Sequence, residues 1–535
     1  MKKKIFFITL IELIVGFIYY YIALPPINIS SNDFWSFVIF LLAILLILVT
    51  LSNFTGDFKT IFTKKRLKDY SKGMIAIIGL ILLIVIGMSV VNFFCSPIFN
   101  AKSYSNRIKI DESGEFTRDI EQVNFKSLPL LDRESSEKLG DRVMGQMKDL
   151  VSQFYVSNEY TQINYNNDIL RVTPLEYADF IKWISNRNEG IKAYITVNSV
   201  DGESKLIRIE KGMKYMPSAY FNEKLERKLR FDYPTTIFGE ANFEIDNEGN
   251  PYWIIPTKGY TGVGLKTKIT GVIIFDPITG ESYKYSKKDI PTWVDNAFDP
   301  NLIIEQVDNW GTYKRGFLNS IFGQKEVVNT TEGYNYLAMN DDIYMYTGIT
   351  SVLADESNLG FILTNMRTGE TVFYSVPGAE EYSAMSSAEG QVQQMKYTST
   401  FPLLINLNNR PTYVVSLKDA AGLVKMYGFV DVSDYQKVVV TDASKGIEVA
   451  AQNYLNSNET EIDSDTLTKK EITIKEINIG VTSGNTYYYI KDENNNKYKV
   501  SLKVSDNLPF IKINDKLTIG YYESKLEIKE IKKLY

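Results

Sequence analysis

Three long apolar runs occupy the first 95 residues of this 535-residue chain. They extend over residues 5–24, 34–51 and 74–95. Each has close to the roughly 20 residues that a helix needs to cross the hydrocarbon core of a bilayer. Residues 96–535 contain no run of this kind. The pattern predicts a three-helix transmembrane anchor over residues 1–95, followed by a large body outside the bilayer.

Basic residues flank these runs unevenly. Lysines at positions 2, 3 and 4 precede the first run, and the 52–73 loop between the second and third runs contains Lys59, Lys64, Lys65, Arg66, Lys68 and Lys72. The 25–33 loop has no Lys or Arg. Because basic loops stay in the cytoplasm, we expect a multi-pass membrane protein. Its N-terminus is then cytoplasmic, and residues 96–535 are extracytoplasmic. An exported chain with a single cysteine cannot form an intramolecular disulfide, which favours a bacterial plasma membrane.

Four stretches of the body recur in the same order farther along the chain. The pairs are 160–170 with 334–344, 194–204 with 361–371, 243–255 with 403–415, and 271–276 with 426–431, at offsets of 174, 167, 160 and 155. The falling offset indicates longer loops in the first copy. The pattern predicts an internal duplication, with a first segment over 155–298 and a second segment over 330–455.

Each segment alternates apolar and polar residues between Asp-Gly, Thr-Gly or Asn-Glu-Gly turns, which is typical of β-hairpins. A helical spacing of apolar residues interrupts this pattern at 218–229 in the first segment and at 383–395 in the second. We therefore expect each segment to be an antiparallel sheet with a helix packed on it, an α+β unit.

The hairpin at 275–285, FDPITGESYKY, resembles the PepSY module of bacterial envelope proteins, and 243–256 has the strand pair expected before it. The second segment departs from this motif, because 431–435 reads DVSDY. The body is also similar to an uncharacterised family of membrane-anchored proteins of low-GC Gram-positive bacteria. Stretches such as FGEANFEIDNEGNPYWI and GAEEYSAMSSAEG carry this likeness. The resemblance implies an envelope role, such as binding or inhibiting secreted proteases.

The C-terminal region predicts a separate small domain. Residues 456–469 read as a polar linker, and 470–535 contain five short candidate strands, which fits an OB-like or SH3-like barrel. Tyr487 and Tyr489 are candidates for a ligand-binding face, although packing in the barrel core is the favoured interpretation. The remaining ranges, 96–154 and 299–329, read as connectors.

Composition excludes several classes of chemistry. There is no histidine and one cysteine, Cys95, so intramolecular disulfides, histidine catalysis and His- or Cys-ligated zinc are excluded. Residues 1–95 contain 9 basic and 4 acidic side chains and so carry a net charge of +5. Because the whole chain has a net charge of −5, residues 96–535 carry −10. An acidic body argues against nucleic acid as a partner and against lying flat on anionic lipid. No cofactor is expected.

The remaining candidate sites each have a structural alternative. Asp341 and Asp342 follow Asn340 and could ligate Ca²⁺, but turn formation is the favoured interpretation. Three tryptophans could line a sugar or peptide groove, although packing explains most of them: Trp253, Trp293 and Trp310. Glu12 lies inside the first apolar run, where a structural role is favoured over ion conduction.

The sequence therefore predicts a non-enzymatic membrane protein of the cell envelope. Its body would bind or regulate another envelope protein or peptide, its other partner is the lipid bilayer, and homo-oligomerisation stays open. Two alternatives remain. One is a cell-wall hydrolase that works with carboxylates, and the other is an accessory subunit of a transport complex.

Overall fold

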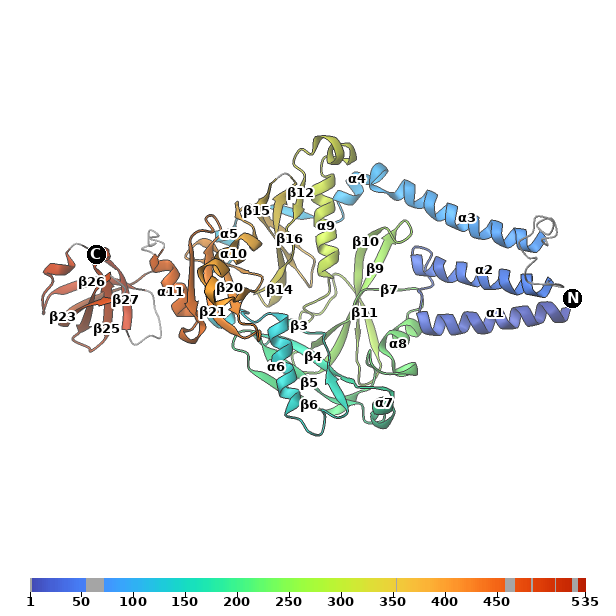
Figure 1. Ribbon diagram of the computed structural model, residues 1–535, viewed down its shortest axis with the longest axis horizontal. Coiled ribbons are helices and arrows are strands. Elements are labelled where there is room, and N and C mark those ends of the chain that lie inside the picture. Colours follow the sequence, from blue (N-terminus) through green and yellow to red (C-terminus); the bar gives the residue numbers. More distant parts are fainter. Residues whose placement is uncertain are drawn as a thin grey trace. The chain divides into compact units, whose positions relative to one another are not determined.

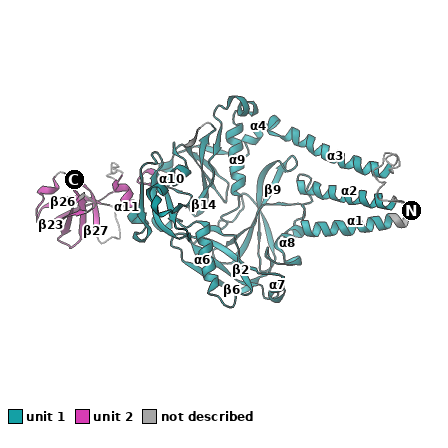
Figure 2. Cartoon of the chain, viewed as in Figure 1, with its two compact units in different colours: residues 1–405, 411–450 teal, residues 406–410, 451–535 magenta. Residues whose placement is uncertain are grey.

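The computed structural model describes residues 2–53, 72–352, 354–457, 467–482, 485–505, 507–521 and 528–535. The chain forms two compact units, which are described separately (Figure 2). Unit 1 contains residues 1–405 and 411–450, and unit 2 contains residues 406–410 and 451–535.

Unit 1 begins with three long helices that pack side by side (Figure 1): α1 (Lys2–Ala23), α2 (Asn32–Asn53) and α3 (Lys72–Cys95). All three are long and apolar enough to cross a membrane, which confirms the predicted spans. The basic 54–71 part of the loop lies outside the described residues.

The stretch after α3 is well structured, although its sequence reads as a connector. It contains α4 (Pro97–Ser105), β1 (Ile110–Gly114), α5 (Phe116–Asp119), a 3₁₀ turn (Phe125–Ser127) and α6 (Arg133–Gly145). Strand β1 pairs in parallel with β16 (Thr371–Tyr374), at the edge of a sheet formed far along the chain.

The first segment forms two antiparallel sheets. One has the order β2-β4-β5-β6, with β3 also on β4, and the other has the order β11-β10-β9-β7, with β8 also on β9. The strands of the first sheet are β2 (Phe154–Val156), β3 (Thr161–Tyr165), β4 (Asp168–Tyr177), β5 (Ile191–Asn198) and β6 (Ser204–Met213). Those of the second are β7 (Ile237–Phe238), β8 (Asn242–Ile245), β9 (Pro251–Thr261), β10 (Lys266–Phe275) and β11 (Ser282–Ser286).

Two helices belong to this segment, α7 (Phe180–Asn186) and α8 (Leu225–Asp232). The helix predicted over 218–229 starts later than expected. Residues 221–223 instead form a 3₁₀ turn in which Phe221 has a φ of 52°, and an α-helix cannot continue through this conformation.

The second segment also forms two sheets. One has the order β16-β15-β14-β12, with β13 also on β14 and β17 on β15, and the other has the order β18-β20-β21-β22, with β19 also on β20. The first comprises β12 (Val328–Thr330), β13 (Asn335–Met339), β14 (Asp342–Ser351), β15 (Ala354–Asn365), β16 and β17 (Gly378–Ala379). The second comprises β18 (Thr398–Ser399), β19 (Leu403–Leu407), β20 (Arg410–Lys418), β21 (Val424–Asp431) and β22 (Val438–Asp442).

Helix α9 (Pro300–Tyr313) and a π-helical turn (Asn319–Gly323) connect the two segments. Helix α10 (Glu381–Gln391) precedes β18 and overlaps the predicted 383–395 stretch, whose end forms a 3₁₀ turn (Gln393–Met395). Another 3₁₀ turn (Ala443–Lys445) and helix α11 (Ile447–Ser457) follow β22.

Strand order and register recur between the two segments. Equivalent cross-strand pairs are Tyr165–Asp168 and Met339–Asp342, Pro174–Tyr194 and Gly348–Phe361, Val197–Ser204 and Thr364–Thr371, and Trp253–Phe275 and Tyr413–Val430. These pairs are related by the offsets of 174, 167, 160 and 155 seen in the sequence. A slip of one residue in register would turn every side chain to the other face of the sheet. Because the register is the same in both segments, equivalent positions face the same side of the equivalent sheet.

Strands β9 and β10 are buried on both faces. Trp253 and Phe275 belong to a core shared with β4 and β5, whereas Ile254 and Ile274 belong to a second core with α9, β14 and β15. Because both faces are covered, the middle of β9 is a continuous apolar run rather than an alternating one. This hairpin is the common wall between the two cores.

Unit 2 contains a closed barrel with the strand order β23-β24-β25-β27-β26, which confirms the predicted five-stranded barrel. Its elements are β23 (Thr468–Thr482), β24 (Asn485–Asp492), β25 (Lys497–Ser501), two 3₁₀ turns (Leu502–Val504 and Leu508–Phe510), β26 (Lys516–Tyr521) and β27 (Ile528–Leu534). Most of the predicted linker, residues 458–466, lies outside the described residues.

Candidate functional site

The Asn340–Asp342 cluster forms a tight turn between β13 and β14. Asn340 and Asp341 have φ values of 51° and 65°, as a two-residue hairpin turn of the I′ type requires. The carboxylate of Asp342 is nine-tenths buried and accepts hydrogen bonds from Arg367 Nε and Asn365 Nδ2, both at 2.7 Å. The described residues contain no cluster of three or more Asp, Glu, His or Cys that could hold a metal ion.

The three candidate tryptophans lie in different environments. Trp253 on β9 is 1% exposed and packs against Phe243, with ring centroids 5.3 Å apart. Trp293 packs at 5.1 Å against Tyr252, on the face of β9 opposite to Trp253. Trp310 on α9 lies 4.8 Å from the Lys314 ammonium. The structure therefore does not bring the three side chains into one groove.

In the barrel, Tyr488 points into the core and is 6% exposed, whereas its neighbours Tyr487 and Tyr489 are half-buried on the opposite face of β24. Lys499 lies 3.9 Å from the ring centroid of Tyr487. Glu12 lies within α1, and the structure gives its Oε2 atom no hydrogen-bond partner.

The candidate site with the most distinctive chemistry is one that the sequence patterns did not single out. A cavity of about 420 Å³ lies where β3, β4, β13 and the start of α9 meet, and Arg171 of β4 lines it. We call it the Arg171 cavity. Its aromatic lining includes Tyr334, Tyr336, Phe298 and Phe401.

Arg171 is 7% exposed and makes no ion pair or side-chain hydrogen bond with the residues that the structure describes. Burial lowers the pKa of its guanidinium to about 10, and it stays protonated at neutral pH. Gln162 Nε2, which belongs to the same lining, is also buried without a partner. Buried donors without acceptors carry a desolvation cost, and a bound acceptor would relieve it.

Carboxylates stand at the mouth of the Arg171 cavity. Glu159 and Glu240 line it, are exposed and form no ion pair with described residues. Asp132 and Asp299 also line it, but they are paired with Lys418 at 2.7 Å and with Lys258 at 3.1 Å. The lining of the cavity thus combines a buried cation, aromatic rings and exposed carboxylates.

A buried carboxyl pair supports one wall of the Arg171 cavity. Glu244 accepts hydrogen bonds from the backbone N–H groups of Asp295 at 2.9 Å and Asn296 at 2.8 Å. Asn296 in turn donates through Nδ2 to the Gln162 carbonyl at 2.9 Å. Burial raises the pKa of Glu244 to about 7, and burial together with Glu244 raises that of Asp295. The pair is enclosed and does not face solvent, so its role is to hold the wall.

The second segment has a buried carboxyl of its own. Glu381, the first residue of α10, is fully buried, and Asn358 Nδ2 donates to its Oε2 at 3.5 Å and to the Tyr413 hydroxyl oxygen at 3.2 Å. Burial raises the pKa of Glu381 to about 7. Its Oε1 atom has no partner among the described residues.

Arg171 and Glu244 are charged residues within strongly apolar stretches, DILRVTPL and ANFEID. By the alternation of a strand, each lies on the face opposite to its core-facing neighbours, Val172 and Phe243, so the sequence alone does not mark it as buried. Both are buried in the structure, because the second face of each strand is covered as well. A charge within an apolar strand is costly to bury and therefore belongs to either a buried network or a site.

No family model matches the chain, and no curated protein matches it. Among solved structures, an ACO/RPE65 chimera aligns at a TM-score of 0.13 and 8% identity over 71% of this chain and 65% of its own length. An α-L-arabinofuranosidase from Lactobacillus brevis aligns at 0.14 and 8% over 70% and 90%. At these scores neither likeness bears on fold or activity. What the fold defines is an α+β protein with three helices able to span a membrane and a C-terminal barrel.

Proposed function

We propose that this is a membrane-anchored binding protein of the bacterial envelope, whose extracytoplasmic body takes a carboxylate-bearing peptide in the Arg171 cavity. The observation that carries this proposal is the Arg171 guanidinium, which is buried in the lining of a cavity and has no counter-ion among the described residues. A planar guanidinium recognises a carboxylate through two parallel N–H···O bonds.

The rest of the Arg171 cavity favours a peptide over a simple anion. Glu159 and Glu240 at the rim can accept the ammonium group of a zwitterion, and the tyrosine and phenylalanine walls offer apolar contact. A volume of about 420 Å³ suits a few residues of peptide rather than a folded domain.

A binding role also agrees with the chemistry available. The chain has no histidine, and the buried Glu244–Asp295 pair is closed off from any polymeric substrate. The recurrence of strand register supports the proposed duplication of a PepSY-like module, for which an envelope-binding role is the implied function. The orientation with residues 96–535 outside the cell, and the Gram-positive source, are part of the same proposal.

The test compares two pools of tripeptides with identical side chains, one with free C-terminal carboxylates and one with C-terminal amides. Binding to the full-length protein in mild detergent is measured by calorimetry. We expect the carboxylate pool to bind and the amide pool to lose at least about tenfold in affinity, because loss of a hydrogen bond to a charged group costs about 1.5–3 kcal/mol.

Arg171→Met should abolish binding while leaving the melting temperature unchanged or higher, since it removes an unpaired buried charge and keeps the volume. Arg171→Lys should bind weakly, because lysine retains the positive charge but lacks the paired N–H donors of the guanidinium that match a carboxylate. The control is Arg208→Met, at an exposed arginine of β6 paired with Asp149, which should bind as the wild type does. Equal binding of both pools, or retained binding by Arg171→Met, would rule the proposal out. Reproducible peptide hydrolysis would instead favour the carboxylate hydrolase.

A further inference from the structure

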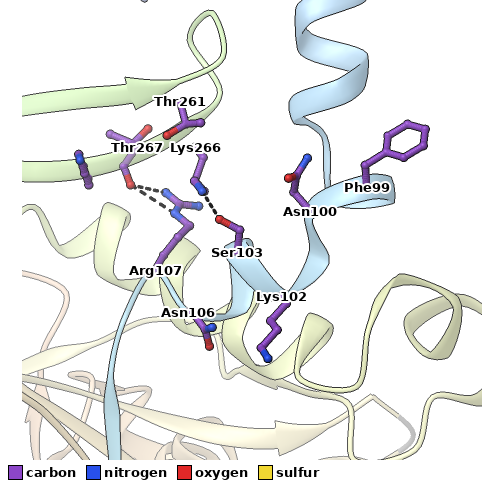
Figure 3. A pocket seen from close by; sticks show the side chains of 10 residues that line it. Phe99, Asn100, Lys102, Ser103, Asn106, Arg107, Thr261, Lys266 and Thr267 are labelled. Atoms are coloured by element: carbon purple, nitrogen blue, oxygen red, sulfur yellow. Dashed lines mark hydrogen bonds between the residues drawn. The ribbon is translucent and has the colours of Figure 1, made fainter.

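A second cavity, of about 620 Å³, lies where the chain leaves α3. Helix α4 forms one side of it, and the ends of β9 and β10 form the other (Figure 3). It shares no lining residue with the Arg171 cavity. Since α3 ends at Cys95 and the lining begins at Phe99, this pocket lies at the level where a spanning helix meets the lipid headgroups. We call it the α4 pocket.

The α4 pocket is strongly cationic, although the body as a whole is acidic. Lys102, Lys266 and Lys268 line it, and none of the three forms an ion pair with the residues that the structure describes. Figure 3 shows Lys266 donating to the Ser103 hydroxyl from across the pocket. Burial lowers the pKa of Lys266, with a smaller contribution from Arg107. The lining of the pocket therefore offers cations that have no acidic partner among the described residues.

Arg107 holds this arrangement together. Its side chain is 3% exposed, donates to the Thr267 carbonyl through Nη2 at 2.8 Å and forms an ion pair with Glu305 at 2.7 Å. Glu305 pairs with Arg107 through Oε1 and is not among the residues that line the pocket. Arg107, which follows α4 in the chain, thereby ties the end of this helix to β10.

Aromatic side chains next to the α4 pocket mark the membrane boundary. Phe93, Phe94 and Phe99 form a cluster with centroids 5.1–5.6 Å apart, and each is more than half exposed. Phenylalanine rings have no polar group, so exposed ones at the end of a spanning helix are best covered by lipid acyl chains. A lipid whose headgroup entered the α4 pocket would have its acyl chains beside these rings.

We propose that the α4 pocket binds the phosphodiester headgroup of an anionic phospholipid, with Lys102, Lys266 and Lys268 as the charged contacts and Ser103 and Asn100 as hydrogen-bonding groups. Basic pockets at the membrane surface bind such headgroups through several simultaneous charge contacts. The net charge of the body argues against a broad electrostatic association with anionic lipid, but a local pocket requires only its own cations.

The experiment uses full-length protein in mild detergent and two probe lipids with the same acyl chains, dioleoylphosphatidylglycerol and dioleoylphosphatidylcholine. Bound lipid is counted by native mass spectrometry during a titration. We expect the anionic lipid to bind tighter on the order of 100-fold, because each of the three lysines near an anionic headgroup contributes about a fivefold factor.

The triple variant Lys102→Gln, Lys266→Gln and Lys268→Gln should weaken binding of the anionic lipid on the order of 100-fold and bring it to the level of the zwitterionic lipid. The matched control replaces with Gln three exposed lysines elsewhere on unit 1 that form no ion pair with described residues: Lys148, Lys211 and Lys445. The control should bind as the wild type does. Equal binding of the two lipids, or equal losses in the two triple variants, would overturn the proposal. If inorganic phosphate displaces the lipid at equal concentration, the pocket is a site for a soluble anion and the lipid proposal is wrong.

Discussion

Asn92 and Val263 exchange two hydrogen bonds where α3 meets the body. Asn92 Nδ2 donates to the Val263 carbonyl at 3.0 Å, and the Val263 N–H donates to Asn92 Oδ1 at 2.8 Å. The side-chain amide of Asn92 thus pairs with both the N–H and the carbonyl of Val263, as the backbone of a neighbouring strand would. Val263 is at the tip of the β9–β10 hairpin, the same hairpin that forms the common wall between the two cores of unit 1.

Other contacts join the body to the membrane helices. Arg230 of α8 donates to the Leu24 carbonyl at 2.9 Å, and the Ile27 N–H donates to the Pro234 carbonyl at 2.7 Å. Burial lowers the pKa of Arg230 to about 10, so that it remains charged at neutral pH. These contacts couple the position of the helices to the sheets that form the Arg171 cavity.

Asn92→Ala should loosen this attachment without unfolding either part. The Val263 N–H then loses its acceptor, which costs about 1–3 kcal/mol of local stability. Hydrogen exchange measured by mass spectrometry should therefore be faster for the peptide that covers residues 261–266. The control is Ser89→Ala in the same helix, where the hydroxyl bonds only to Val85 of its own helix. Unchanged exchange in Asn92→Ala would contradict the role of this pair.

Stability should fall as pH rises from about 5 to above 7. The pKa of Glu244 and that of Glu381 are both raised to about 7 by burial, whereas a solvated Glu titrates near 4.5. A carboxyl whose pKa is raised in the folded state stabilises the fold fully at a pH below its pKa in the unfolded chain. This stabilisation is lost as the pH rises through its pKa in the folded state. Each group contributes a slope of at most about 1.4 kcal/mol per pH unit.

Glu381→Gln should flatten this slope, because the amide cannot ionise. Unfolding by denaturant would be followed at several pH values between 5 and 8.5. This window avoids the opposite contribution of Asp132 and Glu134, whose pKa values are lowered and which destabilise only under more acidic conditions. The matched control, Glu210→Gln on the exposed side of β6, should keep the wild-type slope. A slope that is identical in Glu381→Gln would show that this carboxyl stays ionised in the fold.

Gly202 and Gly369 occupy equivalent turns but should respond differently to alanine. Both have positive φ, 79° and 76°, so either substitution strains the backbone by about 1 kcal/mol. A Cβ at Gly369 would also lie 2.4 Å from the Phe298 ring, whereas at Gly202 the nearest atom is a Leu131 methyl at 3.3 Å. Thermal unfolding should therefore show a larger loss for Gly369→Ala. Equal losses would indicate that Phe298 moves aside at no cost.

The orientation of the helices can be tested with a reporter that is active only outside the cell. Because the basic residues cluster in the 52–73 loop, fusions after Asn100 or Tyr535 should be active, and a fusion after Lys68 should be inactive. The reverse pattern would move the body to the cytoplasm and remove the envelope role.

Much of the architecture follows from the sequence alone. The spanning helices depend only on the length and hydropathy of local runs, and hairpins depend on turn residues such as Asn340, Asp341 and Gly369, whose conformations are local. The recurrence of strands between the two segments was visible as well, because the offset is constant within each matched stretch and so conserves the alternation of inward and outward positions there.

Tertiary structure decided the sites. Arg171 and Gln162 are separated from Tyr336 and Phe401 by more than 150 residues, and Lys102 from Lys266 by a similar distance, so that no local pattern could place them around one cavity. Burial was likewise invisible. Whether Glu244 is a solvated carboxylate or a buried acid with a raised pKa depends on which strands cover it, and this is a property of the packed sheets rather than of neighbouring residues.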